Sequence, residues 1–122
     1  MTIQEALRAE LTTAFPEIPN YYMETGSTDE CPPYFVVVFV DGAPEFPAGR
    51  TGRWQITGSD TDPDALDARM EQVIGLFHYK QGDFGGRLIA SVKCILEVGP
   101  LKNEAGIYEK HIDLEIFYRK EN

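Results

Sequence analysis

Positive charge is scarce in this sequence. Lysine and arginine together number 11 against 20 aspartates and glutamates, which gives a formal net charge of −9 at pH 7. The basic residues are scattered, and no run of them occurs. Because nucleic acid repels a strongly acidic chain whose positive charges are not gathered on one face, we expect no sequence-specific binding of DNA or RNA.

Cysteine and long apolar runs are also lacking. The two cysteines, Cys31 and Cys94, are too few for a disulfide scaffold and do not have metal-ligand spacing. We expect both to be reduced thiols, as is usual in the cytoplasm. No segment approaches the roughly 20 apolar residues that cross a bilayer, and MTIQEALRAEL does not have the charged start and apolar run of a signal peptide. The sequence therefore predicts no membrane partner.

The motifs of common catalytic sites are missing as well. The sequence contains no GxSxG, no phosphate-binding glycine loop and no HExxH. The two histidines, His78 and His111, stand beside no cysteine or serine that would form a nucleophile pair. We therefore predict that the protein is not an enzyme and that it needs no cofactor.

What the sequence does contain is the composition of an ordinary globular protein. Of its 122 residues, 43% are hydrophobic and 25% are charged. A chain of this length buries one hydrophobic core. We therefore expect a single domain over residues 1–122.

Two amphipathic helices are predicted. Thr2 and Glu5 form a capping box at the start of the first helix, and Pro16 ends it. The second helix ends near Gly82. Apolar residues recur at helical spacing on one face of each helix, namely Ile3, Leu7, Leu11, Ala14 and Phe15 in the first and Leu66, Met70, Val73, Ile74 and Phe77 in the second.

Several segments have the composition of strands. YFVVVFV is a continuous apolar run that suits a strand covered on both faces. The other strand segments are a short one in NYYMET and longer ones in RWQITGSD, RLIASVKCILEV and IYEKHIDLEIFYRK. Glycine and proline predict a long loop over residues 41–52, where Phe46 either packs against the body or faces a partner, and turns at QGDFGG and GPLKNEAG.

The last two strands alternate apolar and polar residues, so each has one buried face. The apolar sets are Leu88, Ala90, Val92, Cys94, Leu96 and Val98 in the first of them, and Ile112, Leu114, Ile116 and Tyr118 in the second. The expected fold is therefore α+β, a mostly antiparallel sheet of four to five strands with two helices packed on one face.

The run GSDTDPDALDARMEQ resembles the skeleton of a calcium-binding EF-hand loop. Asp60, Asp62 and Asp64 alternate, but the sixth position is Ala65 instead of the glycine that the turn requires, and a strand precedes the loop instead of a helix. A helix start explains the same residues, because Asp62 suits the N-cap and Pro63 the first helical position. We therefore predict a helix cap and no metal site.

The order of these features resembles the tail terminator, or tail-completion, proteins of long-tailed bacteriophages. An amphipathic helix precedes PPYFVVVFV, and RWQITGSDTDPDALDARMEQVIGLF then reads as a strand that leads into an aspartate-capped helix. RLIASVKCILEV and IYEKHIDLEIFYRK complete the pattern. The long segment at 41–52 and the strong negative charge depart from it.

This resemblance implies a structural virion protein. Its members assemble in the host cytoplasm as a ring, usually a hexamer, at the head-proximal end of the tail. There the ring stops polymerisation of the tube protein and offers a surface to the head–tail connector protein. Candidate residues for contacts with other copies or with the tube are Phe46, Arg50, Arg53, Tyr108 and Phe117.

Other interpretations of the same sequence remain open. One is a head–tail connector or minor capsid subunit, and another is a small-ligand-binding α+β module. Arg50 and Arg53 either pair with carboxylates across a subunit boundary or are exposed to solvent.

Overall fold

The structure, a computed structural model, describes residues 2–23, 31–45, 49–84 and 87–119. The described strands form one sheet in the order β1-β2-β3-β6-β5-β4, in which the β1–β2 pair is parallel and the other described pairs are antiparallel. The elements in chain order are α1 (Ile3–Ala14), β1 (Asn20–Tyr22), β2 (Tyr34–Glu45), β3 (Gly49–Asp60), α2 (Pro63–Phe77), β4 (Gly82–Phe84), β5 (Arg87–Lys102) and β6 (Tyr108–Arg119).

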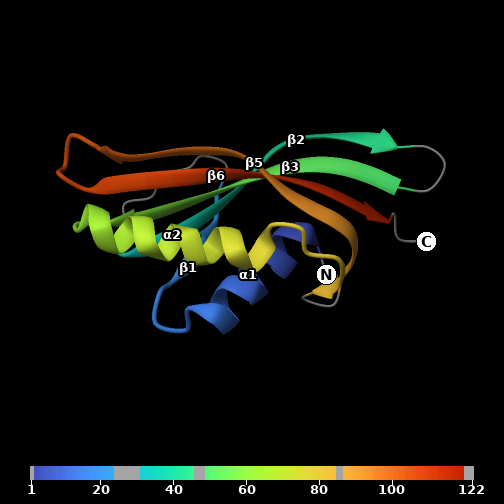
Figure 1. The fold of residues 1–122 in the computed structure, drawn as a ribbon, viewed down its shortest axis with the longest axis horizontal. Helices are drawn as coiled ribbons and strands as arrows, with labels where there is room; N and C mark the ends of the chain where they lie inside the picture. Colours follow the sequence, from blue (N-terminus) through green and yellow to red (C-terminus); the bar gives the residue numbers. More distant parts are fainter. Residues whose placement is uncertain (1, 24–30, 46–48, 85–86, 120–122) are drawn as a thin grey trace.

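Both helices lie on the same face of the sheet (Figure 1), so the predicted α+β class is confirmed. The apolar stripes of the helices and the inward residues of β2, β3, β5 and β6 meet in one core. Its largest fully buried members include Phe35, Phe77, Leu7, Leu11 and Ile56. The very short β4 was not expected, because its sequence, GDF, has the composition of a turn.

The first part of β2, residues 34–38, is buried on both faces, as the continuous apolar run predicted, whereas Phe39 and Val40 at the end of that run are 46% and 43% exposed. Phe35 and Val37 belong to the core beneath the helices. Val36 faces the other way and belongs to a second, smaller cluster, against which Tyr21 and Met23 pack. The chain that follows α1 therefore covers part of the face that the helices leave free.

Both helices begin as the sequence predicted. The Thr2 side chain accepts a hydrogen bond from the amide of Glu5, and the Asp62 carboxylate accepts bonds from the amides of Asp64 and Ala65. Each cap satisfies amides that have no acceptor within the helix.

The predicted end of α2 near Gly82 is wrong, since the helix ends at Phe77. Tyr79 adopts a positive φ of 63°, which turns the chain out of the helix. Its amide then donates to the carbonyl of Val92 on β5. Tertiary hydrogen bonding stops this helix, and no local sequence signal marks the point.

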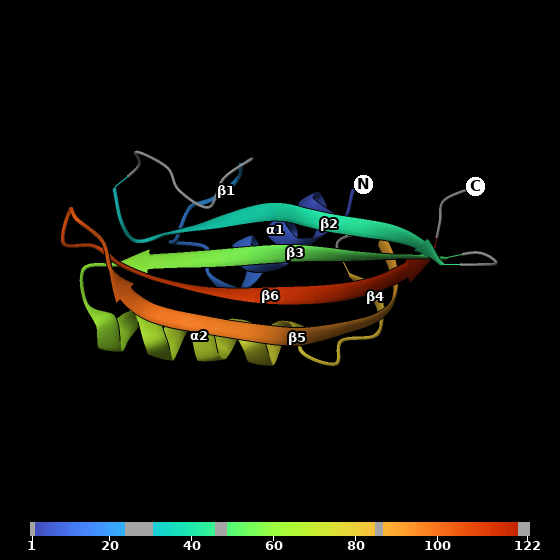
Figure 2. The same ribbon diagram turned by 90° about the horizontal axis from the view of Figure 1, so that it is seen from above.

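The predicted loop over residues 41–52 is also wrong. Asp41 pairs with Arg53, and the register continues to Glu45 opposite Gly49, so the segment is the end of a β-hairpin. We call this hairpin end, residues 41–45 and 49–53, the arm. It extends past the helices (Figures 1 and 2). Phe46 lies in the segment 46–48, outside the described residues.

Strict alternation along β5 was predicted, and the structure contradicts it. Cys94 pairs with Leu114, but the next pair joins Leu96 to Asp113, so Ile95 is an extra residue in a β-bulge. Beyond the bulge the strand presents Leu96 and Val98 to the face away from the helices. Leu96 is 45% exposed, whereas the sequence placed it in the core.

Two predicted turns contain strand structure instead. Gly82–Phe84 of QGDFGG is β4, which pairs with β5. In GPLKNEAG the strand β5 continues to Lys102, and the turn follows it. A further register shift between Val98 and Leu101 lets the strand pass Pro100 and still pair with β6.

Candidate functional site

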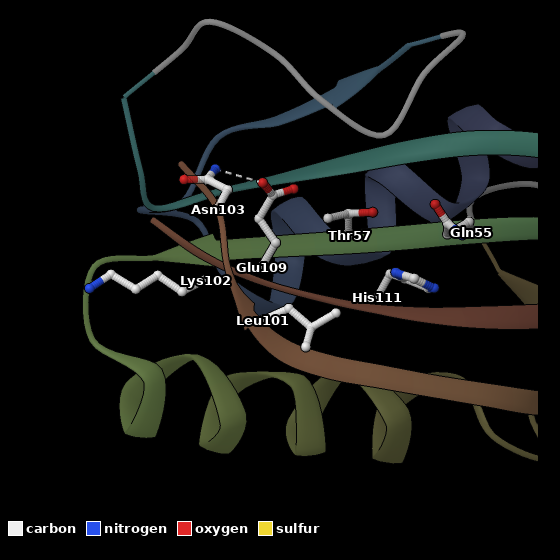
Figure 3. Close-up of a pocket in the computed structure, with 7 residues that line it drawn as sticks. All are labelled: Gln55, Thr57, Leu101, Lys102, Asn103, Glu109 and His111. Carbon is white, nitrogen blue, oxygen red and sulfur yellow. Dashed lines mark hydrogen bonds between the residues drawn. The ribbon is translucent and has the colours of Figure 1, made fainter. Parts of the chain in front are cut away.

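The face of the sheet away from the helices carries a shallow groove of about 350 Å³. Thr57 lies on its floor and is only 4% exposed. Figure 3 shows residues of β3, β5 and β6 around it, with the Lys102 side chain extending away from the other labelled residues. The lining residues are Gln55, Thr57, Leu101, Lys102, Asn103, Glu109 and His111.

One end of this groove is held in place by Asn103, in the turn between β5 and β6. Its side-chain oxygen accepts hydrogen bonds from the amides of Ala105 and Ile107. Its side-chain nitrogen donates to Glu109 over 2.8 Å (Figure 3). The asparagine therefore fixes the turn and orients one carboxylate of the groove.

A buried carboxylate lies next to the groove on β6. Asp113 is 2% exposed. It pairs with the guanidinium of Arg53 over 3.1 Å and accepts a hydrogen bond from Gln55 over 3.2 Å. Because a buried charge is costly unless it is paired, these two β3 side chains explain how Asp113 can lie in the sheet.

A second recess, of about 310 Å³, lies on the helix side at the base of the arm. We call it the aromatic pocket. Phe39 and Tyr22 are 46% and 42% exposed, whereas Trp54 is 3% exposed. The Phe39 and Trp54 rings pack edge to face with centroids 5.1 Å apart. The lining residues are Thr2, Ile3, Gln4, Tyr22, Phe39, Trp54 and Tyr118.

Trp54, which lines this pocket, carries a buried donor. Its indole Nε1 is buried and has no hydrogen-bond partner among the residues that the structure describes. Buried polar groups of native proteins are nearly always paired, so such a donor calls for an explanation. Gly52 makes room for the indole, because a Cβ there would lie 2.3 Å from the Trp54 ring.

A third group of charges, beneath the sheet, is structural. Lys110 of β6 is 3% exposed and contacts Asp67 of α2 and Glu97 of β5. Burial alone would lower the pKa of Lys110, but the hydrogen bonds with the two carboxylates outweigh it and raise that pKa. The lysine therefore ties α2 to the sheet.

The described residues show neither a metal-ligand cluster nor an activated thiol. Within the described ranges no three His, Cys, Asp or Glu side chains gather in a way that could hold a metal ion. Cys31 and Cys94 are free thiols, and burial raises the pKa of Cys94, which disfavours its reactive thiolate. No helix among the described residues is long and apolar enough to cross a membrane.

The sequence-predicted contact residues do not form one site. Arg53 pairs with Asp113 of its own chain, and its side chain remains 39% exposed. Phe117 is half-buried and pairs in register with Thr51 on the arm. Tyr108 lies at the opposite end of β6, where the Lys102 amine lies 5.8 Å from its ring centroid.

The other two predicted residues belong to the arm. The backbone of Arg50 lies in β3 opposite Tyr118, and Phe46 lies outside the described residues. Sequence reasoning missed the aromatic pocket, because Tyr22, Phe39 and Trp54 read as strand residues. The available signal was the aromatic content of these strands, since exposed aromatic residues are enriched in protein interfaces.

The fold, the groove and the aromatic pocket thus define a small α+β protein with separate candidate contact surfaces. No family model and no curated protein matches the chain. Among solved structures, the fold is similar to that of a chain described as the virion of a native gene transfer agent particle. The two share 9% sequence identity, the match covers 97% of this chain and 95% of that chain, and the TM-score is 0.70.

Proposed function

We propose that the protein is a structural virion protein that caps the head-proximal end of a phage tail tube as a ring. The observation that carries the proposal is the fold likeness to a virion chain, which spans nearly the full length of both chains. The sequence pattern, which resembles tail terminators, supports the same function independently. The ring ends polymerisation of the tube and provides the surface that the head connector joins.

The distribution of surfaces fits such a subunit. A ring is a head-to-tail assembly, so each copy needs two different patches for its neighbours and a further surface for the tube. The groove and the aromatic pocket lie on opposite faces of the sheet, and the arm extends beyond the helices. Three separate regions are therefore available for three different contacts.

Deletion of the gene from its phage tests this function. We expect tails of uncontrolled length that do not join heads, seen by negative-stain electron microscopy, and rescue when the purified protein is added to growing tubes. Tails of normal length that fail to join heads would favour the alternative, a head–tail connector. Normal particles would exclude both.

A small-ligand-binding module has one observation in its favour. The groove volume of about 350 Å³ lies within the range of ligand pockets. A thermal-melting screen with metabolites separates this alternative from the first. A ligand-dependent rise in melting temperature that His111→Ala abolishes would support it, together with normal tails in the deletion phage.

A further inference from the structure

We propose that the aromatic pocket of one copy receives the arm tip of a second copy. The tip is the sequence Glu45-Phe46-Pro47-Ala48 that joins β2 to β3. This inference rests on the proposed function, since it supplies the contact between neighbouring copies that a ring requires.

The pocket offers aromatic walls that suit an apolar segment. Its walls are aromatic, and two of them, Tyr22 and Phe39, are half-exposed. The third aromatic wall, Trp54, is 3% exposed and packs against Phe39 and Tyr118. Aromatic-lined grooves bind segments that contain proline, because the proline ring packs against the aromatic side chains.

The arm tip has the matching chemistry. Phe46 and Pro47 supply a large aromatic ring and a proline side by side in the sequence. Glu45 adds a carboxylate next to them. The pocket includes Ile3 and Gln4 in the first turn of α1, where amides lack an acceptor within the helix and the helix dipole favours negative charge.

The described end of the arm lies far from the pocket of its own chain. Trp54 and Gly49 are five residues apart on the same strand, so Gly49 lies roughly 17 Å from Trp54 at about 3.4 Å per residue, and only three residues join Gly49 to its partner Glu45. The arm is also held straight, because Gly49 pairs with Glu45 on one side and with Arg119 on the other. The occupant must therefore come from another molecule.

This arrangement gives a head-to-tail contact. Each copy offers one tip and one pocket at different places, so the same contact can repeat from copy to copy and close into a ring. A symmetric dimer that uses a single patch does not follow from this geometry. The arm thus becomes the element that links one subunit to the next.

A peptide titration tests the contact directly, because Trp54 is the only tryptophan of the chain. We expect a peptide of residues 41–52 to change the tryptophan emission of the full-length protein in a saturable way. The same peptide with Phe46→Ser should bind at least about tenfold more weakly, as is typical of an aromatic anchor. No saturable change, or equal binding of both peptides, would overturn the inference.

Variants of the whole chain provide the second test. Phe39→Ser should lose peptide binding, whereas Tyr79→Ser, which changes an aromatic residue that is 69% exposed elsewhere, should retain it. In a mixture of the two variants, the Phe46→Ser copy keeps an intact pocket and the Phe39→Ser copy keeps an intact tip. One tip–pocket contact can therefore form between one copy of each. We expect this mixture to give heterodimers in sedimentation velocity and neither variant alone to associate.

Phage experiments separate this inference from the proposed function. If phage carrying Phe46→Ser and Phe39→Ser still end and join their tails while the deletion phage does not, the inference is wrong and the function stands. If Phe39→Ser abolishes binding to tail tubes but not association between copies, the pocket binds the tube protein and the inference is also wrong. If the deletion phage is normal, the function fails, and the peptide titration still decides the contact.

Discussion

At the scale of single residues, the acidic side chains around the start of α2 act on the backbone. Asp60 accepts a hydrogen bond from the amide of Asp62, and Asp62 in turn caps the helix. Asp64 lies in the first turn, where the helix dipole favours its charge. Asp60 and Asp62 thus stabilise the turn between β3 and the start of α2, and the predicted helix cap at Asp62 is confirmed.

Asp62→Ala tests the cap. We expect a loss of about 1 kcal/mol in the free energy of unfolding, because the amides of Asp64 and Ala65 lose their acceptor. Chemical denaturation followed by tryptophan fluorescence measures it. Calcium should leave the melting temperature of the wild type unchanged, and a calcium-dependent rise would show a metal site.

Asp60 makes the stability depend on acid pH. Burial alone would raise the pKa of Asp60, but hydrogen bonds from the Asp62 amide and the Arg69 guanidinium, the latter 2.8 Å away, outweigh it and lower that pKa below its usual value of 3.8. The lowered pKa adds stability above pH 3.8, which is lost as the pH falls through the folded-state value. We expect Asp60→Asn to lower stability at pH 7 and to reduce its decline between pH 5 and 2 (roughly the window in which such carboxylates titrate).

A series of urea denaturation curves across this pH range measures the effect. Glu17→Gln is the control, because Glu17 is exposed and lies outside both helices. Identical pH profiles for the Asp60→Asn variant and the wild type would contradict the role of the Arg69 pair.

At the scale of elements, the arm depends on a close contact between the backbone of Gly52 and the indole ring of Trp54. We expect Gly52→Ala to cost about 1–3 kcal/mol, because its Cβ would overlap the rigid indole of Trp54. Gly75→Ala on α2 is the matched control, since no atom lies within 4 Å of its Cβ position. That change should stabilise the helix by about 0.5–1 kcal/mol. Thermal unfolding of the two variants measures both effects, and equal melting temperatures would contradict the prediction.

The bulge at Ile95 decides which apolar residues of β5 are buried. Val92 is fully buried and Leu96 is 45% exposed, although strict alternation places them on one face. We expect Val92→Ala to cost about 2 kcal/mol or more and Leu96→Ala to stay within about 0.5 kcal/mol of the wild type. Equal losses in urea denaturation would mean that β5 has no bulge in solution.

At the scale of the whole molecule, the net charge of −9 opposes association between copies. The screening length falls from about 10 Å at 0.1 M salt to about 3 Å at 1 M. We therefore expect self-association, measured by sedimentation velocity, to become stronger as salt increases. Weaker association at high salt would mean that attraction between opposite charges drives the contact. That result would contradict a contact made mainly by an apolar tip in an aromatic pocket.

Much of the fold could be predicted from local patterns, and the site could not. The caps at Thr2 and Asp62 and the inward residues of β6 follow from spacing alone. The arm was missed because glycine and proline normally break strands, yet here Gly42 and Pro44 lie in β2 and pair with β3. Of the predicted contact residues, Arg53 turned out to pair within its own chain, a long-range contact that no local pattern contains.

The sequence by itself determined the α+β class, the buried stripes of both helices and the cap at Asp62, because these depend on periodicity and on the residues at a few positions. Tertiary structure decided the end of α2, the bulges of β5, the arm and the pocket in which Tyr22, Phe39 and Trp54 meet. These features depend on hydrogen bonds and packing between residues far apart in the chain. Such hydrogen bonds and packing contacts form only after the strands have paired, so local sequence patterns do not contain them.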